Sequence, residues 1–417
     1  MLDCAAFLPR PFCICAFLCL FAATTKMASK LGPRFNDFVL SLVTLEHHFD
    51  PYFRDAFNAV FQRPIVAVTQ LLLRTVRKNR ETRLCEEIPV PGEETITAGI
   101  KDAMAQYTKR EYAGRIAERA GNTKTYGVVR AEFHVLENIP ATYKHGVFAQ
   151  PKTYPAWIRF GGPGPASPPD IADSGILSIG IKLMGVPGDK LLDDEKATQD
   201  FTGISCPTFT TPNIVENLKL QKQIYARTPV FYFINPLDSH FGDMTMQGIY
   251  ARMNRSPLEV RYWSCVPYLL GEGQAMKYSV TPTSGLKTKI PWNPPDDWLR
   301  QSMAQTLSQR DAEFDFSIQL QTNHKRMPIE DASIEWPERL SRFVTVAKIT
   351  IPKQEFTSEA QTKFARELSY NPWHCIAEHR PLGNQNRARY LIYSELSRLR
   401  QAMNDEPHIE PNGTEQF

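Results

Sequence analysis

Residues 119–160 read RAGNTKTYGVVRAEFHVLENIPATYKHGVFAQPKTYPAWIRF, and this stretch decides the fold. The segments 126–135 and 156–160 within it are rich in β-branched and aromatic residues, and turn formers bound them. The first segment also alternates apolar and polar side chains in the manner of a half-buried antiparallel strand. The stretch therefore predicts two strands of an antiparallel sheet.

Strands of the same character continue along the chain after residue 160. They occupy 175–184, 259–266, 276–280, 314–320 and 342–351. Helical periodicity marks interposed segments such as 213–225 and 386–403. The sequence has no regular alternation of strand and helix and no internal repeat. We expect an α+β fold in which an antiparallel β-barrel or curled sheet has helices packed outside it.

The composition excludes several classes of protein. The 417 residues are 42% hydrophobic, which supplies ample material for a buried core and excludes a disordered or fibrous chain. Lys and Arg total 48 against 45 Asp and Glu, and the resulting net charge of +3 is too small for a broad nucleic-acid-binding surface. The eight cysteines form no CxxC pair and no Cys/His zinc spacing, so neither a zinc site nor a disulfide framework is indicated.

Four parts follow one another along the chain. Residues 1–26 contain the apolar run FCICAFLCLFAA, and a secretory signal, a short membrane anchor and an upstream extension before Met27 are all open, so the compartment is open too. Residues 27–90 are expected to form a helical arm. Residues 91–403 are expected to form the folded domain, and the polar tail 404–417 is expected to fray.

The arm contains an amphipathic helix candidate at 63–78, RPIVAVTQLLLRTVRK, with proline where a first helical turn tolerates it. Its leucines and valines are surrounded by arginine and lysine, so the helix could lie on a membrane surface as a peripheral contact. The more common alternative is an arm packed on its own domain or on a partner subunit.

No hydrolase or nucleotide-binding signature is present: the sequence lacks GxSxG, GxxxxGK[ST] and a GxGxxG that follows a strand. The absence of these signatures favours cofactor chemistry. Three stretches, in this order, carry that chemistry: RAGNTK (119–124) with the strands after it, GILSIGIKLM (175–184) with ATQDFTGISCPTF (197–209), and RELSYNPWH (366–374) with EHRPLGNQNRAR (378–389).

Taken together, the three stretches resemble the catalase superfamily over roughly residues 96–400. The likeness is to its short members without the extra C-terminal domain, a group that includes allene oxide synthase-like enzymes. The resemblance implies a catalase-type barrel and haem b as the cofactor. It also implies assembly through N-terminal arms, so a homo-oligomer is a possible partner arrangement.

The resemblance assigns roles to particular residues. Tyr370 matches the axial tyrosine whose phenolate holds the haem iron, with Arg366 four residues earlier, one turn away if the segment is helical. Arg119 and Arg159 match arginines that pair with haem propionates, since guanidinium forks bind buried carboxylates. Arg380 matches a further arginine near the haem, although it is displaced by a few residues.

Two distal positions depart from the catalase pattern. Asn122 stands where catalases have their acid/base histidine, and Ser205 stands where they have an asparagine. His134, the histidine nearest to this stretch, lies on an alternating strand and is expected to face outward as a structural residue. Phe209, Trp157 and the barrel lining are expected to supply apolar contacts for a substrate.

An asparagine cannot take up a proton near neutral pH, so we expect weak or absent disproportionation of hydrogen peroxide. The leading hypothesis is a haem-dependent oxidoreductase that acts on an organic hydroperoxide or other small organic substrate. Three alternatives stay open: a non-enzymatic haem-binding or degenerate catalase-like protein, an authentic peroxide-scavenging catalase, and a haem-free barrel that holds a lipophilic ligand.

Overall fold

The structure is a computed structural model that describes residues 12–162, 164, 167–172 and 175–417, with side chains from residue 32 onward. Residues 1–26 were expected to be a signal, an anchor or an upstream extension. Of these, residues 1–11 lie outside the described part of the chain, and residues 12–26 are described only as helical backbone. Nine strands and their connecting helices follow the arm. The strands are β1 (Thr125–Val135), β2 (Thr153–Gly161), β3 (Ser178–Met184), β4 (Thr198–Ile204), β5 (Tyr262–Trp263), β6 (Tyr268–Leu269), β7 (Ala275–Pro282), β8 (Ala312–Leu320) and β9 (Val344–Ile351).

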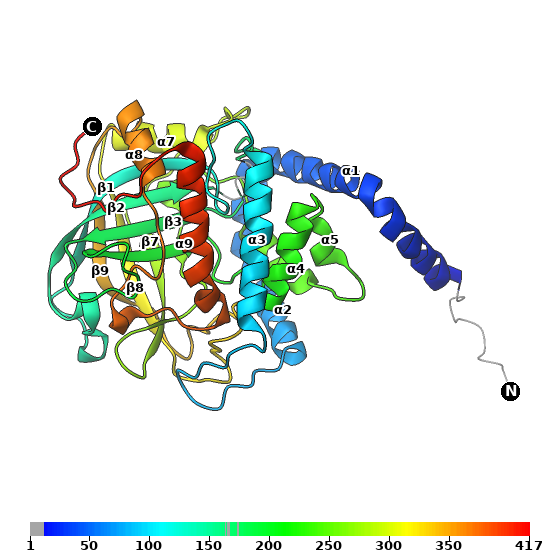
Figure 1. The fold of residues 1–417 in the computed structure, drawn as a ribbon, viewed down its shortest axis with the longest axis horizontal. Coiled ribbons are helices and arrows are strands. Elements are labelled where there is room, and N and C mark those ends of the chain that lie inside the picture. The colour runs from blue at the N-terminus through cyan, green and yellow to red at the C-terminus, as the bar shows by residue number, and fades with distance from the viewer. Residues whose placement is uncertain (1–11, 163, 165–166, 173–174) are drawn as a thin grey trace.

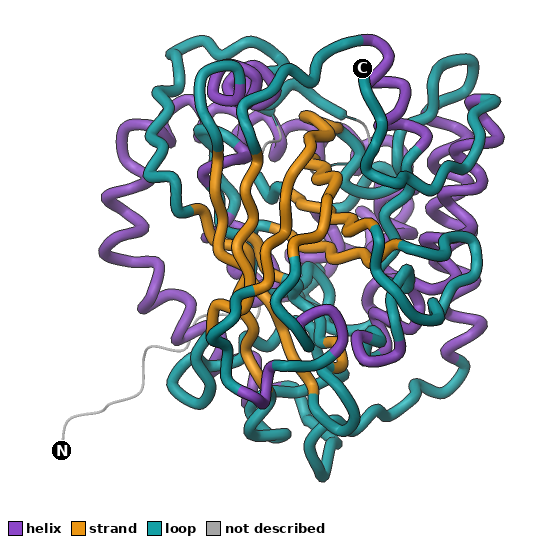
Figure 2. The backbone as a smooth tube through the Cα atoms, turned by 90° about the vertical axis from the view of Figure 1, so that its left-hand side faces the viewer, coloured by secondary structure: helices purple, strands orange, loops and turns teal. Residues whose placement is uncertain are grey.

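Eight of these strands close into an antiparallel barrel. Their order is β5–β4–β3–β2–β1–β9–β8–β7, and the ring closes because β5 pairs with both β4 and β7. The ninth strand, β6, pairs with β7. Figure 2 shows the strands at the centre with helices around them. The expected α+β fold with an antiparallel barrel is confirmed.

Alternation along each strand separates an inner from an outer set of side chains. On β3, Ile181 and Leu183 belong to the hydrophobic cluster that fills the barrel, whereas Gly180 and Lys182 point to the outer side. On β4, Phe201 points inward in the same way. All residues of β3 are buried because helices and loops cover the outer side.

Aromatic rings fill the interior of the barrel. The Phe201 ring lies 6.2 Å from Phe133, 5.0 Å from Phe316 and 5.3 Å from Tyr278, measured between ring centroids. Such closely packed rings leave no room for a ligand inside the barrel. The expectation that the barrel lining would contact a substrate is therefore wrong, and a haem-free barrel with a ligand inside is wrong for the same reason.

Helices cover the barrel on one side and close one of its ends. They are α3 (Glu93–Glu111), α4 (Ile214–Tyr225), α5 (Val230–Ile234), α6 (Phe241–Tyr250), α7 (Trp298–Leu307), α8 (Glu359–Glu367) and α9 (Asn384–Asn404). α3 packs against both α4 and α9, and the three stand next to one another in Figure 1. Leu299, Met303 and Leu307 of α7 join the barrel core, so α7 closes one end.

The expected N-terminal arm is helical. It consists of α1 (Phe12–Phe57), the π-helical turn η1 (Asn58–Gln62) and α2 (Arg63–Val76). α1 extends away from the body of the protein at its N-terminal end (Figure 1). The predicted helix 63–78 is confirmed as α2, which ends where Arg77 adopts an extended backbone.

Two expectations about local structure are wrong. The long strand predicted at 259–266 is reduced to β5, because Cys265 adopts a left-handed backbone with φ of 59° and turns the chain. The tail does not fray: Glu410 accepts hydrogen bonds from the amides of Lys196 and Ala197 at 2.7 and 2.6 Å. Glu415 accepts one from the Trp157 indole at 2.9 Å.

The packed interior predicts a large cost for removing one of its rings. We expect Phe201→Ala to lose about 3–5 kcal/mol of stability, measured as a lower midpoint of urea unfolding, because the neighbouring rings cannot refill the space. Phe241→Ala is the matched control, since that ring is 61% exposed, and it should shift the midpoint little. Equal shifts in the two variants would contradict a tightly filled barrel.

Candidate functional site

A cavity of about 500 Å³ lies between the outer side of the barrel and the helices α3, α4 and α9. Its volume falls within the range of small-molecule and cofactor sites. Strands β3 and β4 form its floor. Its apolar wall consists mainly of Ile100, Met104, Leu220, Ile224, Phe233, Ile392 and Leu396.

Tyr370 lines this cavity and rests directly on the barrel wall. It follows α8 in the chain, and its ring covers Gly180, where a Cβ atom would lie 2.8 Å from the ring. Glycine is therefore required beneath the ring. The phenol donates to the backbone oxygen of Trp157 at 3.4 Å, which is a long and weak hydrogen bond. Burial raises the pKa of the Tyr370 phenol, although the Arg119 and Arg159 charges oppose this.

Arg119 and Arg159 line the same cavity, as the sequence led us to expect for neighbours of Tyr370. Arg119 donates to the backbone oxygens of Ala365 and Leu368 at 3.0 and 2.7 Å. Arg159 donates mainly to the backbone oxygen of Asn122 at 2.7 Å. Neither forms an ion pair with a carboxylate of the described residues. Burial lowers the pKa of Arg159 to about 9, and the neighbouring Arg119 adds to this.

Two further arginines of the cavity come from α9 and were missed by the sequence analysis. Arg400 donates to the backbone oxygens of Arg366 and Leu368, and burial lowers its pKa to about 9. Arg389 donates to the hydroxyls of Thr202 and Tyr393. Their spacing of eleven residues along α9, about three turns, is a helical signal that could have placed both on one face.

Asn122 also lines the cavity, and its backbone adopts a left-handed conformation with φ of 47°. Asparagine, aspartate and histidine tolerate this region better than other residues with a side chain. No hydrogen bond of its side-chain amide appears within the described part of the chain. Asn122 is half-buried at the cavity wall.

Three of the predicted site residues lie away from the cavity lining. Ser205 is buried, and its hydroxyl accepts from the Leu177 amide at 2.9 Å. Arg366 pairs with Glu406 at 2.7 Å. Arg380 pairs with Glu87, also at 2.7 Å.

The predicted one-turn relation between Arg366 and Tyr370 is wrong, because α8 ends at Glu367 and Tyr370 lies beyond the helix. The positive charge near the phenol comes instead from Arg119 and Arg159. His134 is exposed and bonds to the Thr153 hydroxyl at 2.9 Å, which confirms that it faces outward. Of the two expected apolar contacts, Phe209 lines the cavity, and Trp157 offers only its backbone oxygen to Tyr370.

A buried ionic network holds the segment around Tyr370. The Lys182 ammonium donates to Glu195 and, at 2.9 Å, to Asp200. His374 bonds to Asp200 at 2.9 Å through Nδ1 and to Asp194 at 3.1 Å through Nε2. Glu195, Asp200 and His374 are close enough together to hold a metal ion, but the Lys182 ammonium already supplies a cation among them.

This network positions Tyr370 through the backbone on either side of it. The Asn371 amide donates to Asp200 at 2.8 Å, and the backbone oxygen of His374 accepts from the Asp200 amide at 2.8 Å. This role was not predicted from the sequence, although Lys182 and Asp200 stand in the quoted stretches. The pattern that could have indicated it is a single charged residue in each of β3 and β4, two strands that are almost entirely buried.

Comparison with known proteins gives the class of fold. No protein-family profile and no curated protein sequence matches the chain. Among solved structures, a fungal catalase is 14% identical with a TM-score of 0.53, over 78% of this chain and 66% of that one. A bacterial catalase is 13% identical with a TM-score of 0.52, over 82% and 70%. Catalase A from Saccharomyces cerevisiae is 14% identical with a TM-score of 0.54, over 78% and 69%.

At these identities the similarity establishes the fold alone. The chain has the barrel-and-helix fold of catalases, which confirms the expected catalase-type barrel. The matched region spans about two thirds of the length of these catalases. The relation to the allene oxide synthase-like short members stays a prediction.

The network also predicts a dependence of stability on pH. Burial opposes protonation of His374, but its bonds to Asp194 and Asp200 outweigh burial and raise its pKa from 6.5 to about 9. Because the pKa is higher in the folded state, the stabilisation is complete below pH 6.5 and is lost as the pH rises through 9. We expect the urea midpoint to fall between these values in the wild-type protein.

His374→Gln should flatten that fall, because glutamine does not titrate, and should lower the midpoint mainly on the acidic side. His134→Gln is the matched control and should keep the wild-type pH dependence, since His134 is exposed. The assignment is wrong if His374→Gln retains the same slope.

Proposed function

We propose that the protein binds haem b in this cavity and acts as a haem-dependent oxidoreductase on an organic hydroperoxide or another small organic substrate. One observation carries the proposal: Arg119 and the buried Arg159 and Arg400 line the cavity together with Tyr370, and no carboxylate of the described residues forms an ion pair with them. Buried cations of this kind call for an anionic ligand. An apolar ligand with anionic groups would match both parts of the cavity.

The residues fit such a group in their chemistry. Haem combines a flat apolar body with two carboxylates, and the cavity combines an apolar wall from α3, α4 and α9 with unpaired guanidinium groups. Tyr370 is a ligand of the type used by haem proteins, and its long bond to Trp157 is weak enough to be exchanged. When bound, the iron would supply the chemistry of O–O bond cleavage.

The chain's own residues have separate tasks in this proposal. Arg119 and Arg159 oppose the rise that burial causes in the pKa of the Tyr370 phenol, and so favour its deprotonated form. Arg400 remains available for an anionic group of cofactor or substrate. Asn122 can donate or accept a hydrogen bond, and so can orient a bound oxygen atom, but it cannot carry a proton. Hydrogen peroxide disproportionation is accordingly weak or absent.

Haem binding is tested with the purified full-length protein and added hemin. We expect a Soret band from the wild-type protein and at least tenfold weaker binding by Tyr370→Phe, because phenylalanine offers no oxygen to iron. Tyr107→Phe is the matched control, since Tyr107 also lines the cavity, and it should bind like the wild type. Equal binding by Tyr370→Phe would exclude Tyr370 as the ligand.

A wild-type protein that binds no hemin overturns the haem proposal. Binding of hemin without turnover of any hydroperoxide would leave a non-enzymatic haem-binding protein, the second candidate. The observation that favours this second candidate is the asparagine at position 122, which removes a proton carrier from the cavity. Turnover of a fatty acid hydroperoxide decides between the two.

The distal position is tested by restoring a base. We expect Asn122→His in the haem-loaded protein to raise hydrogen peroxide turnover about 10²-fold or more, which is the usual contribution of a placed general base. Histidine also tolerates the left-handed backbone at this position. Asn217→His, another asparagine of the cavity, is the control and should produce no gain. Catalase-like turnover by the wild-type protein would contradict the proposal.

A further inference from the structure

The arm helix α2 turns a side with polar and apolar residues toward the body of the protein. The Gln70 side chain donates to the Ser333 backbone oxygen and accepts from the Glu335 amide, both at 2.9 Å. Arg77, just after the helix, donates to Asp243 at 3.0 Å. Leu73 also packs inward, against Met246 and Ile334, so the inward side of α2 carries both polar and apolar contacts.

The opposite side of η1 and α2 is apolar and exposed. It repeats at intervals of three, four and seven residues, which is the spacing of one helical face. Its large side chains are between 49% and 79% exposed. We call this set the outer stripe: Val60, Phe61, Val68, Leu71, Leu72 and Val76.

Positive charge flanks the outer stripe, and negative charge is missing from it. No aspartate or glutamate occurs from residue 56 to residue 80. Arg63, Lys78 and Arg80 are exposed along or just beyond the helix. An exposed apolar face with a cationic margin matches the interface of a bilayer that contains anionic lipid.

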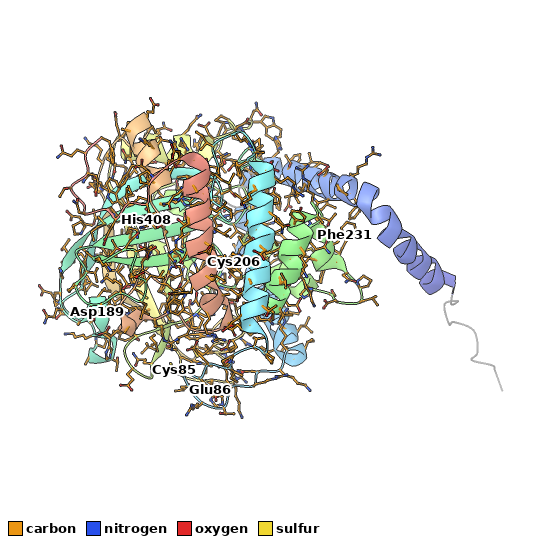
Figure 3. All side chains as sticks on the ribbon, viewed as in Figure 1. Cys85, Glu86, Asp189, Cys206, Phe231 and His408 are labelled. Atoms are coloured by element: carbon orange, nitrogen blue, oxygen red, sulfur yellow. The ribbon has the colours of Figure 1, made fainter. Side chains whose placement is uncertain are left out.

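The neighbouring loop enlarges the apolar surface. α6 packs against α2, and a Cβ atom on Gly242 would lie 2.7 Å from a methyl group of Leu73. Leu237, in the loop before α6, is 84% exposed, and Phe241, the first residue of α6, is 61% exposed. On the α1 side, Phe231 of α5, labelled in Figure 3, packs against Phe35 with ring centroids 5.6 Å apart. The arm and this loop therefore belong to one side of the molecule.

The helix is tied to the body, and this decides between lying on a membrane and crossing it. The segment Gly32–Val76 is long and apolar enough to span a bilayer by length and composition. A spanning helix would have to carry Gln70 and Arg77 away from their partners on the body. Lying in the interface keeps those bonds and buries the outer stripe.

A second copy of the chain is a weaker match. In a two-fold contact, the same surface meets itself. The cations around the outer stripe would then face one another without a carboxylate from the same segment, which is unfavourable.

We propose that the outer stripe docks the protein on the surface of a bilayer containing anionic lipid, with the helix axis in the plane of the interface. This docking does not depend on the cavity or on its ligand. The stripe supplies buried apolar area, and Arg63, Lys78 and Arg80 supply attraction to lipid headgroups.

The test is sedimentation of the full-length protein with sucrose-loaded vesicles of phosphatidylcholine, with and without phosphatidylserine. We expect the wild type to bind vesicles with phosphatidylserine, and Leu71→Ser/Leu72→Ser to bind at least tenfold more weakly. Lys78→Gln/Arg80→Gln should reduce the preference for phosphatidylserine about thirtyfold, because each of the two interfacial cations adds roughly 1 kcal/mol. High salt should weaken the wild type in the same direction.

Ile116→Ser is the matched control, an exposed apolar residue beyond the far end of α3 that should leave vesicle binding unchanged. Unfolding midpoints of all variants should equal that of the wild type, since the substituted side chains are exposed. Vesicle binding that is unaffected by the Leu71 and Leu72 substitutions overturns the proposal. A wild-type dimer that these substitutions dissociate, in a protein that binds no vesicles, also overturns it and assigns the stripe to a second copy.

Discussion

The barrel is closed and its interior is filled with aromatic rings, and every other feature of the site depends on this constraint. Side chains that alternate with the inward rings must point outward, so the floor of the cavity is the outer side of β3 and β4. Gly180 and Thr202 are small enough to leave space there. The helices α3, α4 and α9 then enclose that space rather than cover a plain sheet surface.

Charge is distributed unevenly around this space. On one side of Tyr370, the Lys182 ammonium is balanced by Glu195 and Asp200, and the ions offset one another's cost of burial. Arg119 and Arg159, by contrast, donate to neutral oxygens in the part of the chain that the structure describes. The first group behaves as a structural support. The second group has no carboxylate of the described residues in ion-pair contact, which is a property expected of a binding site.

The sequence predicted the barrel because alternating β-branched and aromatic residues report directly on strands with two different sides. It also predicted that Arg119, Asn122, Arg159 and Tyr370 would come together, and the structure places all four on one cavity. Their roles toward haem stay predictions. The position of Arg366 could not be predicted in this way, because the relation to Tyr370 assumed a helix that ends at Glu367.

Other parts of the site depend on contacts that no local pattern reports. Arg400 reaches the cavity only because α9 packs against α3, which lies almost three hundred residues earlier in the chain. The ordered conformation of the tail could not be predicted either, since its carboxylates find partners such as Trp157 only in the folded protein. Polar composition alone does not distinguish such a tail from a frayed one.

The placement of α9 and the tail has a consequence for the order of events during synthesis. Arg389, Arg400 and Glu410 all leave the ribosome after every barrel strand. A nascent chain can therefore form the barrel while one wall of the cavity is still missing, and a bulky ligand could enter at that stage without any later opening of the finished protein.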